Sequence, residues 1–180
     1  MKIKREDCVL VAVDFQERLL PVIKGNEQLE DTVCKLIEGC KVFNVPILVT
    51  QQYTKGIGRT TEKIAKAIGD FDPIEKITFS ACDEPEFCRL LEETGKKTVL
   101  LTGTEAHICV LQTGLDLLER GYKVYLVMDC IGSRDNNDKK YAGRRMSEAG
   151  AIGVTYESVL FELCHIAGTP EFKQISKIVK

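Results

Sequence analysis

The chain has 180 residues, of which 44% are hydrophobic and 29% are charged, and its formal net charge is −2. This length and balance are typical of one globular domain, which we place over residues 1–180. A chain without an excess of cations is a poor candidate for binding nucleic acid, and no apolar stretch reaches the roughly 20 residues that a transmembrane helix needs.

The first half of the chain predicts three strands and one long helix. The apolar run 9–13 is rich in β-branched residues and predicts a strand buried on both faces. The run ends at Asp14, so it is too short for the apolar region of a secretory signal peptide. Between residues 27 and 43, hydrophobic residues recur with the period of an amphipathic helix. A second strand over 46–50 is followed by the segment 55–59, which we expect to be a mobile loop over a site. A weaker strand is predicted over 73–77.

The second half of the chain alternates helices with strands. Helices are predicted over 84–93, 108–120 and 139–149, each followed closely by a glycine that can end it. Strands are predicted over 98–102, 124–128 and 151–155, and Pro170 can begin a short carboxyl-terminal helix. This alternation predicts parallel pairing with right-handed crossovers. The expected fold class is α/β: a doubly wound, mostly parallel sheet of about six strands in the order 3-2-1-4-5-6, with helices on both faces.

The eight cysteines do not have the spacing of a metal site. No two of them form a Cys-x-x-Cys pair, and the chain has only two histidines, so a zinc cluster is not expected. Disulfide frameworks belong to small secreted domains, whereas this chain has the features of a cytoplasmic protein. We expect seven of the cysteines to be small buried hydrophobic residues, and we expect no metal and no cofactor.

An acid and a thiol follow two strands that we expect to be neighbours. Asp14 comes directly after the first strand, and Cys109 lies in the first turn of the helix after the strand 98–102. Ligands of open parallel sheets bind beyond the carboxyl ends of the strands, at the point where the strand order reverses. A carboxylate opposes a second anion beside it, so we expect Asp14 and Cys109 to share a proton, with a nearby cation stabilising the anionic pair.

The chain resembles the isochorismatase-like cysteine hydrolase family over nearly its whole length. The resemblance rests on Asp14-Phe15-Gln16, on Lys76 to Ala81, and on Gly103-Thr104-Glu105 with Cys109-Val110, together with Ser133-Arg134 and Ala149-Gly150-Ala151. It is similar to the isochorismatase-domain subgroup, whose substrates are mostly unassigned. The resemblance implies a catalytic set of Asp14 as base, Lys76 as stabilising cation and Cys109 as nucleophile.

The resemblance also implies how the rest of the site is built. The Thr104–Glu105 peptide bond would be cis, and the amides of Glu105 and Cys109 would form an oxyanion hole. The stretch Gln51-Gln52-Tyr53 has no histidine where the nicotinamidase branch of the family has metal ligands. We therefore expect an amide, ureide or ester as the small-molecule substrate. Plausible pocket walls, mostly apolar with a few polar anchors, are Phe15, Gln16, Gln52, Tyr53, Phe79 and Ile108.

Two other functional classes remain open at this point. A non-catalytic α/β signalling module of the receiver type would also place an aspartate after its first strand. A thiol redox protein using Cys109 would need a resolving partner such as Cys82 or Cys130.

The family resemblance makes a homo-oligomer the expected state, and the apolar residues Ile175, Ile178 and Val179 are candidates for an exposed contact.

Overall fold

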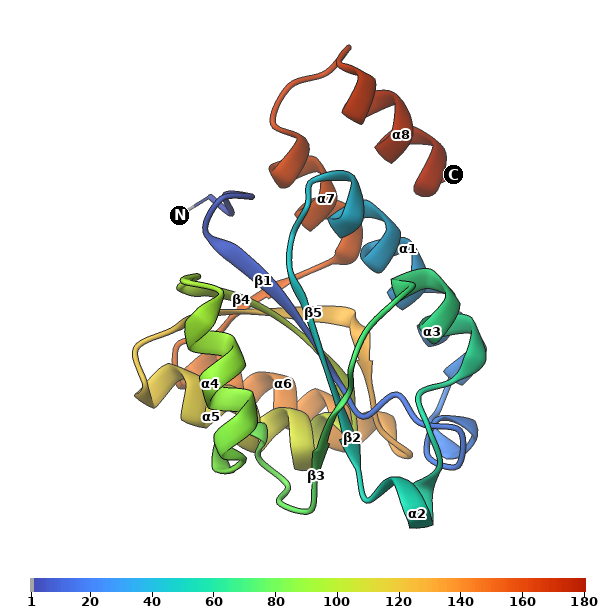
Figure 1. The fold of residues 1–180 in the computed structure, drawn as a ribbon, viewed down its shortest axis with the longest axis vertical. Coiled ribbons are helices and arrows are strands. Elements are labelled where there is room, and N and C mark those ends of the chain that lie inside the picture. The colour runs from blue at the N-terminus through green and yellow to red at the C-terminus, as the bar shows by residue number, and fades with distance from the viewer. Residues whose placement is uncertain (1) are drawn as a thin grey trace.

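The computed structural model describes residues 2–180 and is built on one six-stranded parallel sheet (Figure 1). The strand order is β3-β2-β1-β4-β5-β6, and every pair of neighbouring strands is parallel. The strands are β1 (Cys8–Val13), β2 (Ile47–Gln52), β3 (Ile74–Lys76), β4 (Thr98–Thr104), β5 (Lys123–Gly132) and β6 (Ile152–Val154). This confirms the predicted fold class and the predicted strand order.

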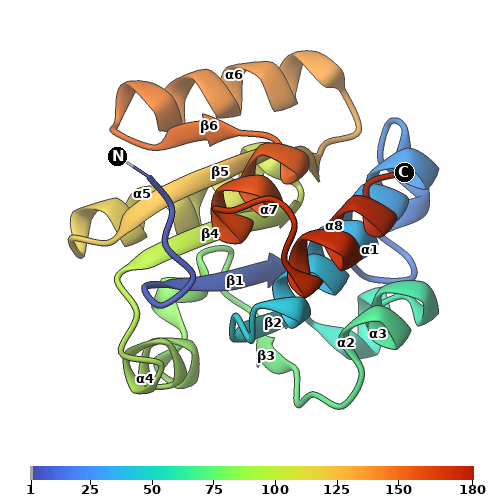
Figure 2. The same cartoon turned by 90° about the horizontal axis from the view of Figure 1, so that it is seen from above.

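Two layers of helices cover the two faces of the sheet (Figures 1 and 2). One layer contains α1 (Asn26–Val42), α3 (Glu62–Ile68), α7 (Tyr156–Cys164) and α8 (Pro170–Ile178). The other contains α4 (Pro85–Glu93), α5 (Leu111–Glu119) and α6 (Asn136–Glu148). Shorter elements are α2 (Thr54–Ile57), the 3₁₀ turns η1 (Leu20–Val22) and η2 (Ala81–Asp83), and the π-helix η3 (Ala106–Val110).

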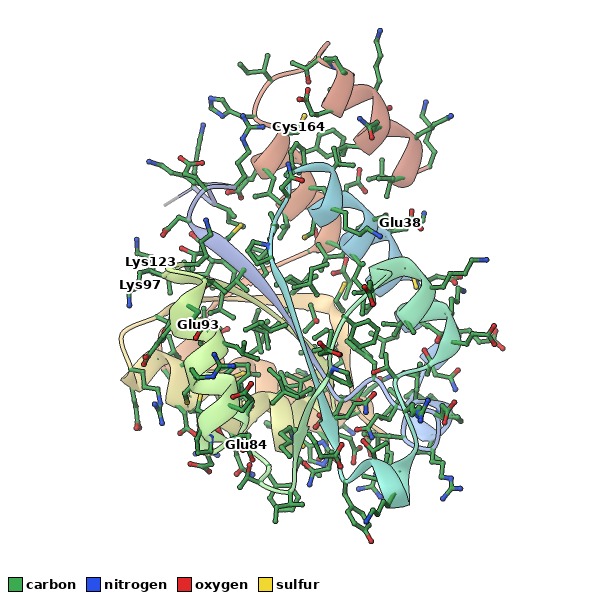
Figure 3. All side chains as sticks on the ribbon, viewed as in Figure 1. Glu38, Glu84, Glu93, Lys97, Lys123 and Cys164 are labelled. Carbon is green, nitrogen blue, oxygen red and sulfur yellow. The ribbon has the colours of Figure 1, made fainter. Side chains whose placement is uncertain are left out.

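The central strands are apolar on both faces because a core lies on each side of them. In β1, Leu10 and Ala12 join the core under α1, whereas Val9 and Val11 join the core under α4, α5 and α6. Fully burying one such aliphatic side chain stabilises a fold by about 1.5–3 kcal/mol. Side chains fill the space between the sheet and both helical layers (Figure 3). The sheet is therefore anchored from both sides, and its strand ends are held in fixed positions.

Several elements differ from the predictions. The sequence patterns did not predict the helices α3 and α7, and the segment 55–59 begins inside the short helix α2 instead of being an irregular loop. The predicted helix over 108–120 is a π-helical turn followed by α5, which starts at Leu111. The expectation of an exposed apolar contact at the carboxyl terminus is wrong for Ile175, which is fully buried in the core under α1, whereas Ile178 and Val179 are only partly buried against the same core. No helix within residues 2–180 is long and apolar enough to cross a lipid bilayer.

Gly103, inside β4, has no room for a side chain. Its φ is +143°, and a Cβ atom built there would lie 2.5 Å from both the Cβ and the carbonyl oxygen of Val13. Because the clash involves backbone beside Asp14, we expect Gly103→Ala to lower the free energy of unfolding by about 2–4 kcal/mol. Gly25→Ala is the control, because Gly25 also has positive φ but a Cβ atom built on it would meet nothing within 4 Å; there we expect a loss of about 1 kcal/mol. Urea denaturation measures both, and equal losses would contradict the steric argument.

Candidate active site

Asp14 directly follows β1 and is completely buried. Its φ of 53° turns the chain sharply out of the strand, and its backbone oxygen accepts a hydrogen bond from Thr104 Oγ1 at 2.7 Å. The carboxylate oxygen Oδ1 accepts a hydrogen bond from Thr50 Oγ1, also at 2.7 Å. The other oxygen, Oδ2, lies 2.7 Å from Lys76 Nζ. Among the described residues, Oδ2 has no hydrogen-bond partner beyond this ammonium, so it is the carboxylate atom left to take a proton.

Lys76 ends β3, and its side chain, like that of Asp14, is 0% exposed. Besides the ion pair, its ammonium donates to Gln52 Oε1 at 2.6 Å and to the carbonyl oxygens of Thr78 and Phe79 at 3.1 and 3.2 Å. A charge buried without such partners would cost several kcal/mol. The buried ammonium of Lys76 is therefore compensated by one carboxylate and three neutral oxygen acceptors.

Cys109 lies in the π-helix η3 and is 5% exposed. The opposite charges of Asp14 and Lys76 both act on its thiol. Burial, followed by the negative charge of Asp14, raises the pKa of the Cys109 thiol to about 12, while the ammonium of Lys76 lowers it. This environment therefore favours the protonated form of the thiol. Nucleophilic attack needs a base to take the proton.

The three side chains meet because β1, β3 and β4 are parallel and end at the same edge of the sheet. Asp14 follows β1, Lys76 closes β3, and Cys109 follows β4 by one turn. β1 pairs directly with β4, so Val13 faces Gly103 in the register. This is the carboxyl edge at which ligands of doubly wound folds bind.

The segment between β4 and η3 also has the features that the family resemblance implies. The Thr104–Glu105 peptide bond is cis. The buried carboxylate of Glu105 accepts hydrogen bonds from the Nε and the backbone N of Arg134 at 3.0–3.2 Å. This ion pair fixes the backbone that leads into η3, because it joins that backbone to the loop after β5.

The residues predicted as pocket walls differ in their exposure to solvent. Phe15 packs in the core, and Gln16 is buried, with its Nε2 donating to the backbone oxygens of Gln52 and Gly58. Tyr53 and Phe79 lie at the surface, 53% and 54% exposed. Of the remaining two, Ile108 is partly buried beside Cys109, and Gln52 contacts Lys76 directly.

Sequence reasoning missed several polar residues around the site. Thr50 binds the Asp14 carboxylate, and its position could have been found, because it ends the strand predicted over 46–50, at the same edge of the sheet as Asp14. His107 has its Nδ1 2.9 Å from Ser133 Oγ and its Nε2 3.7 Å from Asp138 Oδ2. These contacts tie it to the β5–α6 loop and to the first turn of α6.

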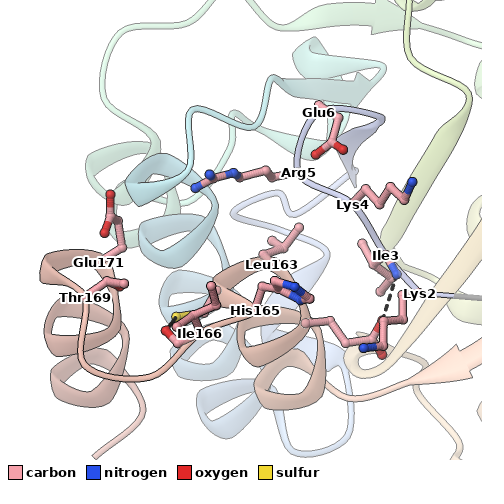
Figure 4. Close-up of a pocket in the computed structure, with 12 residues that line it drawn as sticks. Lys2, Ile3, Lys4, Arg5, Glu6, Leu163, His165, Ile166, Thr169 and Glu171 are labelled. Carbon is pink, nitrogen blue, oxygen red and sulfur yellow. Dashed lines mark hydrogen bonds between the residues drawn. The ribbon is translucent and has the colours of Figure 1, made fainter.

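Three cavities of the molecule lie away from these residues. A cavity of about 450 Å³ at the opposite, amino-terminal end of the strands is lined by the first residues of the chain and by the α7–α8 loop (Figure 4). Two others, of about 480 and 190 Å³, lie beside α1 and α4. None of the three is lined by Asp14, Lys76 or Cys109. Within residues 2–180, no three His, Cys, Asp or Glu side chains are grouped as ligands of a metal ion.

Comparison with known proteins agrees with this architecture. Isochorismatase domain-containing protein 1 from Salmo salar is 36% identical over 172 residues, which are 96% of this chain but only 60% of that protein. The structure of MAR1 ribonuclease from Caenorhabditis elegans is similar with a TM-score of 0.93 and 35% identity, covering 99% of this chain and 92% of the other.

A further structural relative is named as a hydrolase. The YcaC gene product from Escherichia coli, described as an octameric hydrolase of unknown specificity, is similar with a TM-score of 0.88 and 26% identity. The similarity covers 92% of this chain and 83% of that one. The family model of the isochorismatase domain matches residues 8–158. With this match and these relatives, the chain belongs to the isochorismatase family.

Proposed function

We propose that this protein is a cysteine hydrolase that cleaves a small amide, ureide or ester through an acyl-enzyme on Cys109. The observation that carries the proposal is the fully buried ion pair between Asp14 and Lys76, whose opposite charges both act on the Cys109 thiol. An ion pair removed from water is expensive unless its geometry is well satisfied. Its presence beside a thiol at the carboxyl edge of the sheet supports a catalytic role.

In the first step, the Cys109 sulfur attacks the substrate carbonyl while Asp14 Oδ2 takes the thiol proton. The raised pKa of the thiol makes this transfer necessary, because little thiolate exists before the substrate arrives. As the sulfur loses its proton, the negative charge moves from sulfur to the substrate oxygen. The ammonium of Lys76 stays beside the reacting groups and stabilises the anionic state throughout.

In the second step, the tetrahedral oxyanion collapses to the acyl-enzyme. We assign the backbone amides of Glu105 and Cys109 to the oxyanion, where one such donor is typically worth about 10²–10³ in rate. The proton on Asp14 passes to the leaving amine or alcohol. Water then attacks the thioester with Asp14 again as base, which releases the acid and returns the proton to sulfur.

The substrate-binding surface follows from the exposure of the surrounding residues. We assign the exposed Tyr53 and Phe79 and the half-buried Ile108 to the pocket walls, with Phe15 and Gln16 in the layer beneath them.

The eight free thiols support a reducing, cytoplasmic location. A homo-oligomer is the proposed assembly, with support from the octameric relative.

The competing functions have less support. A receiver module is not retained, because the chain belongs to a family whose structural relatives include a hydrolase. A redox role for Cys109 needs a second thiol, but the charged partners of Cys109 are Asp14 and Lys76, whereas Cys82 lies beside Cys88. RNA is a weaker substrate candidate despite the relative named a ribonuclease, because a net charge of −2 provides no general attraction for phosphates.

The test is a panel of small amides, ureides and esters, with an RNA oligonucleotide as an additional substrate. We expect at least one acyl compound to be hydrolysed, with a burst of leaving group and a matching mass increase on the Cys109 peptide after rapid quenching. The RNA should remain intact. Hydrolysis that continues at the same rate after Cys109 has been fully alkylated would refute the mechanism.

A further inference from the structure

Gln52 is placed to direct the ammonium of Lys76. It is the last residue of β2, and the register of the sheet sets it opposite Lys76 at the end of β3. Its Oε1 accepts a hydrogen bond from Lys76 Nζ at 2.6 Å, and its Nε2 donates to the carbonyl oxygen of Ile77 at 2.9 Å. The two contacts fix the orientation of the amide, because the reversed orientation would set an NH₂ group against an ammonium.

The backbone of Gln52 is held as firmly as its side chain. Its N donates to Gln16 Oε1 at 2.7 Å, and its backbone carbonyl oxygen accepts from Gln16 Nε2 at 3.0 Å. The same Gln16 Nε2 also donates to the backbone oxygen of Gly58, at 2.7 Å. Gln52 is therefore fixed through both its backbone and its side chain, and its Oε1 is an acceptor held in place for the lysine.

The ammonium of Lys76 has more acceptors around it than protons. Its three N–H groups face the Asp14 carboxylate, Gln52 and the paired carbonyls of Thr78 and Phe79, and its charge also acts on the Cys109 sulfur. No part of the lysine side chain is exposed, so bulk water does not replace a lost partner. The position of the cation depends on which acceptors hold it.

We propose that Gln52 is a positioning residue that keeps the Lys76 ammonium between the Asp14 carboxylate and the Cys109 sulfur. This inference rests on the proposed function, because it concerns stabilisation of the sulfur anion in that reaction. A neutral amide is suited to the role: it orients the cation without cancelling its charge, which stays available to the sulfur. A carboxylate in its place would both neutralise the ammonium and repel a thiolate.

The test uses alkylation of Cys109 by iodoacetamide, which reports on the thiolate without requiring the substrate. Rates are measured on the full chain from pH 7 to 9.5 by mass analysis of the Cys109 peptide. In the unaltered protein the rate should keep rising over this range, because the pKa of the thiol is raised to about 12. Gln52→Met, which preserves length but removes the acceptor, should slow alkylation roughly five- to tenfold at every pH, as expected for loss of one charge-assisted hydrogen bond.

Two further variants keep the test decisive. Gln52→Glu, which retains an acceptor oxygen, should slow alkylation at least as much as Gln52→Met, because its charge disfavours the thiolate. Gln51→Met is the matched control, since Gln51 is the buried neighbour of the half-buried Gln52 in β2 and bonds Thr54 and Thr60 but not Lys76. It should alkylate within about twofold of the unaltered protein.

The outcomes separate the two proposals. If Cys109 reacts readily in the unaltered protein but equally fast in Gln52→Met, the positioning role is refuted and the hydrolase proposal stands. Equal slowing in Gln51→Met would also refute it, because the effect would then be general loosening of β2. If Cys109 in the unaltered protein reacts no faster than the fully buried Cys40, both proposals fail.

Discussion

Replacing Cys109 with alanine is expected to lower turnover by at least about 10³-fold while leaving the folded protein almost unchanged. The reaction loses its nucleophile, and neither Asp14 nor Lys76 can form the acyl intermediate in its place. The structural loss is small, because replacing a thiol group with a hydrogen atom leaves only a minor cavity beside Val110 and Ala106. We expect the thermal midpoint to move by no more than about 3 °C.

Cys82→Ala provides the matched control for this substitution. Cys82 is buried in the same core as Cys109 but bonds towards Thr113 and lies beside Cys88, away from the ion pair. It should cost a similar amount of stability and leave turnover intact. Calorimetry gives the two midpoints, and the substrate panel gives the two rates. Full activity in Cys109→Ala would remove the basis of the proposed chemistry.

The fold was predictable because its main signals are local and repeated. The buried runs that became β1 and β4 have no polar residue facing solvent, which is typical of a central parallel strand. The helices that were missed have weak signals. α3 is seven residues long with only two buried residues, Ile64 and Ile68. α7 is nine residues long, and its capping box uses Ser158 in place of the usual glutamate.

The active site was predictable only in part, for physical reasons. Asp14 and Cys109 follow buried strands, so the sheet rule places them at one edge, whereas Lys76 closes a three-residue strand with little signal and entered through the family resemblance. The pKa of Cys109 could not be judged from neighbours in sequence. Desolvation is the largest cause of its shift, and burial depends on packing that no local pattern reveals. The contact of Gln52 with the ammonium likewise needs the register of β2 with β3.

Removing the cation tests the ion pair itself, and Lys76→Met is expected to destabilise the protein strongly. It leaves the Asp14 carboxylate completely buried, with Thr50 as the one donor to its side chain within residues 2–180. Breaking a buried pair in this way typically costs about 3–5 kcal/mol, which corresponds to a fall in thermal midpoint of about 6–20 °C for a chain of this size. Lys63→Met, which breaks the exposed pair with Asp31, should cost less than about 1 kcal/mol.

A double variant separates the structural from the catalytic effect of the pair. Asp14→Asn combined with Lys76→Met removes both charges, so no uncompensated ion remains in the core, and much of the lost stability should return. Turnover should stay at least about 10²-fold below that of the unaltered protein, because the base and the cation are both absent. If activity returned together with stability, the pair would be an element of the core alone, and its action on the Cys109 thiol would have no part in the reaction.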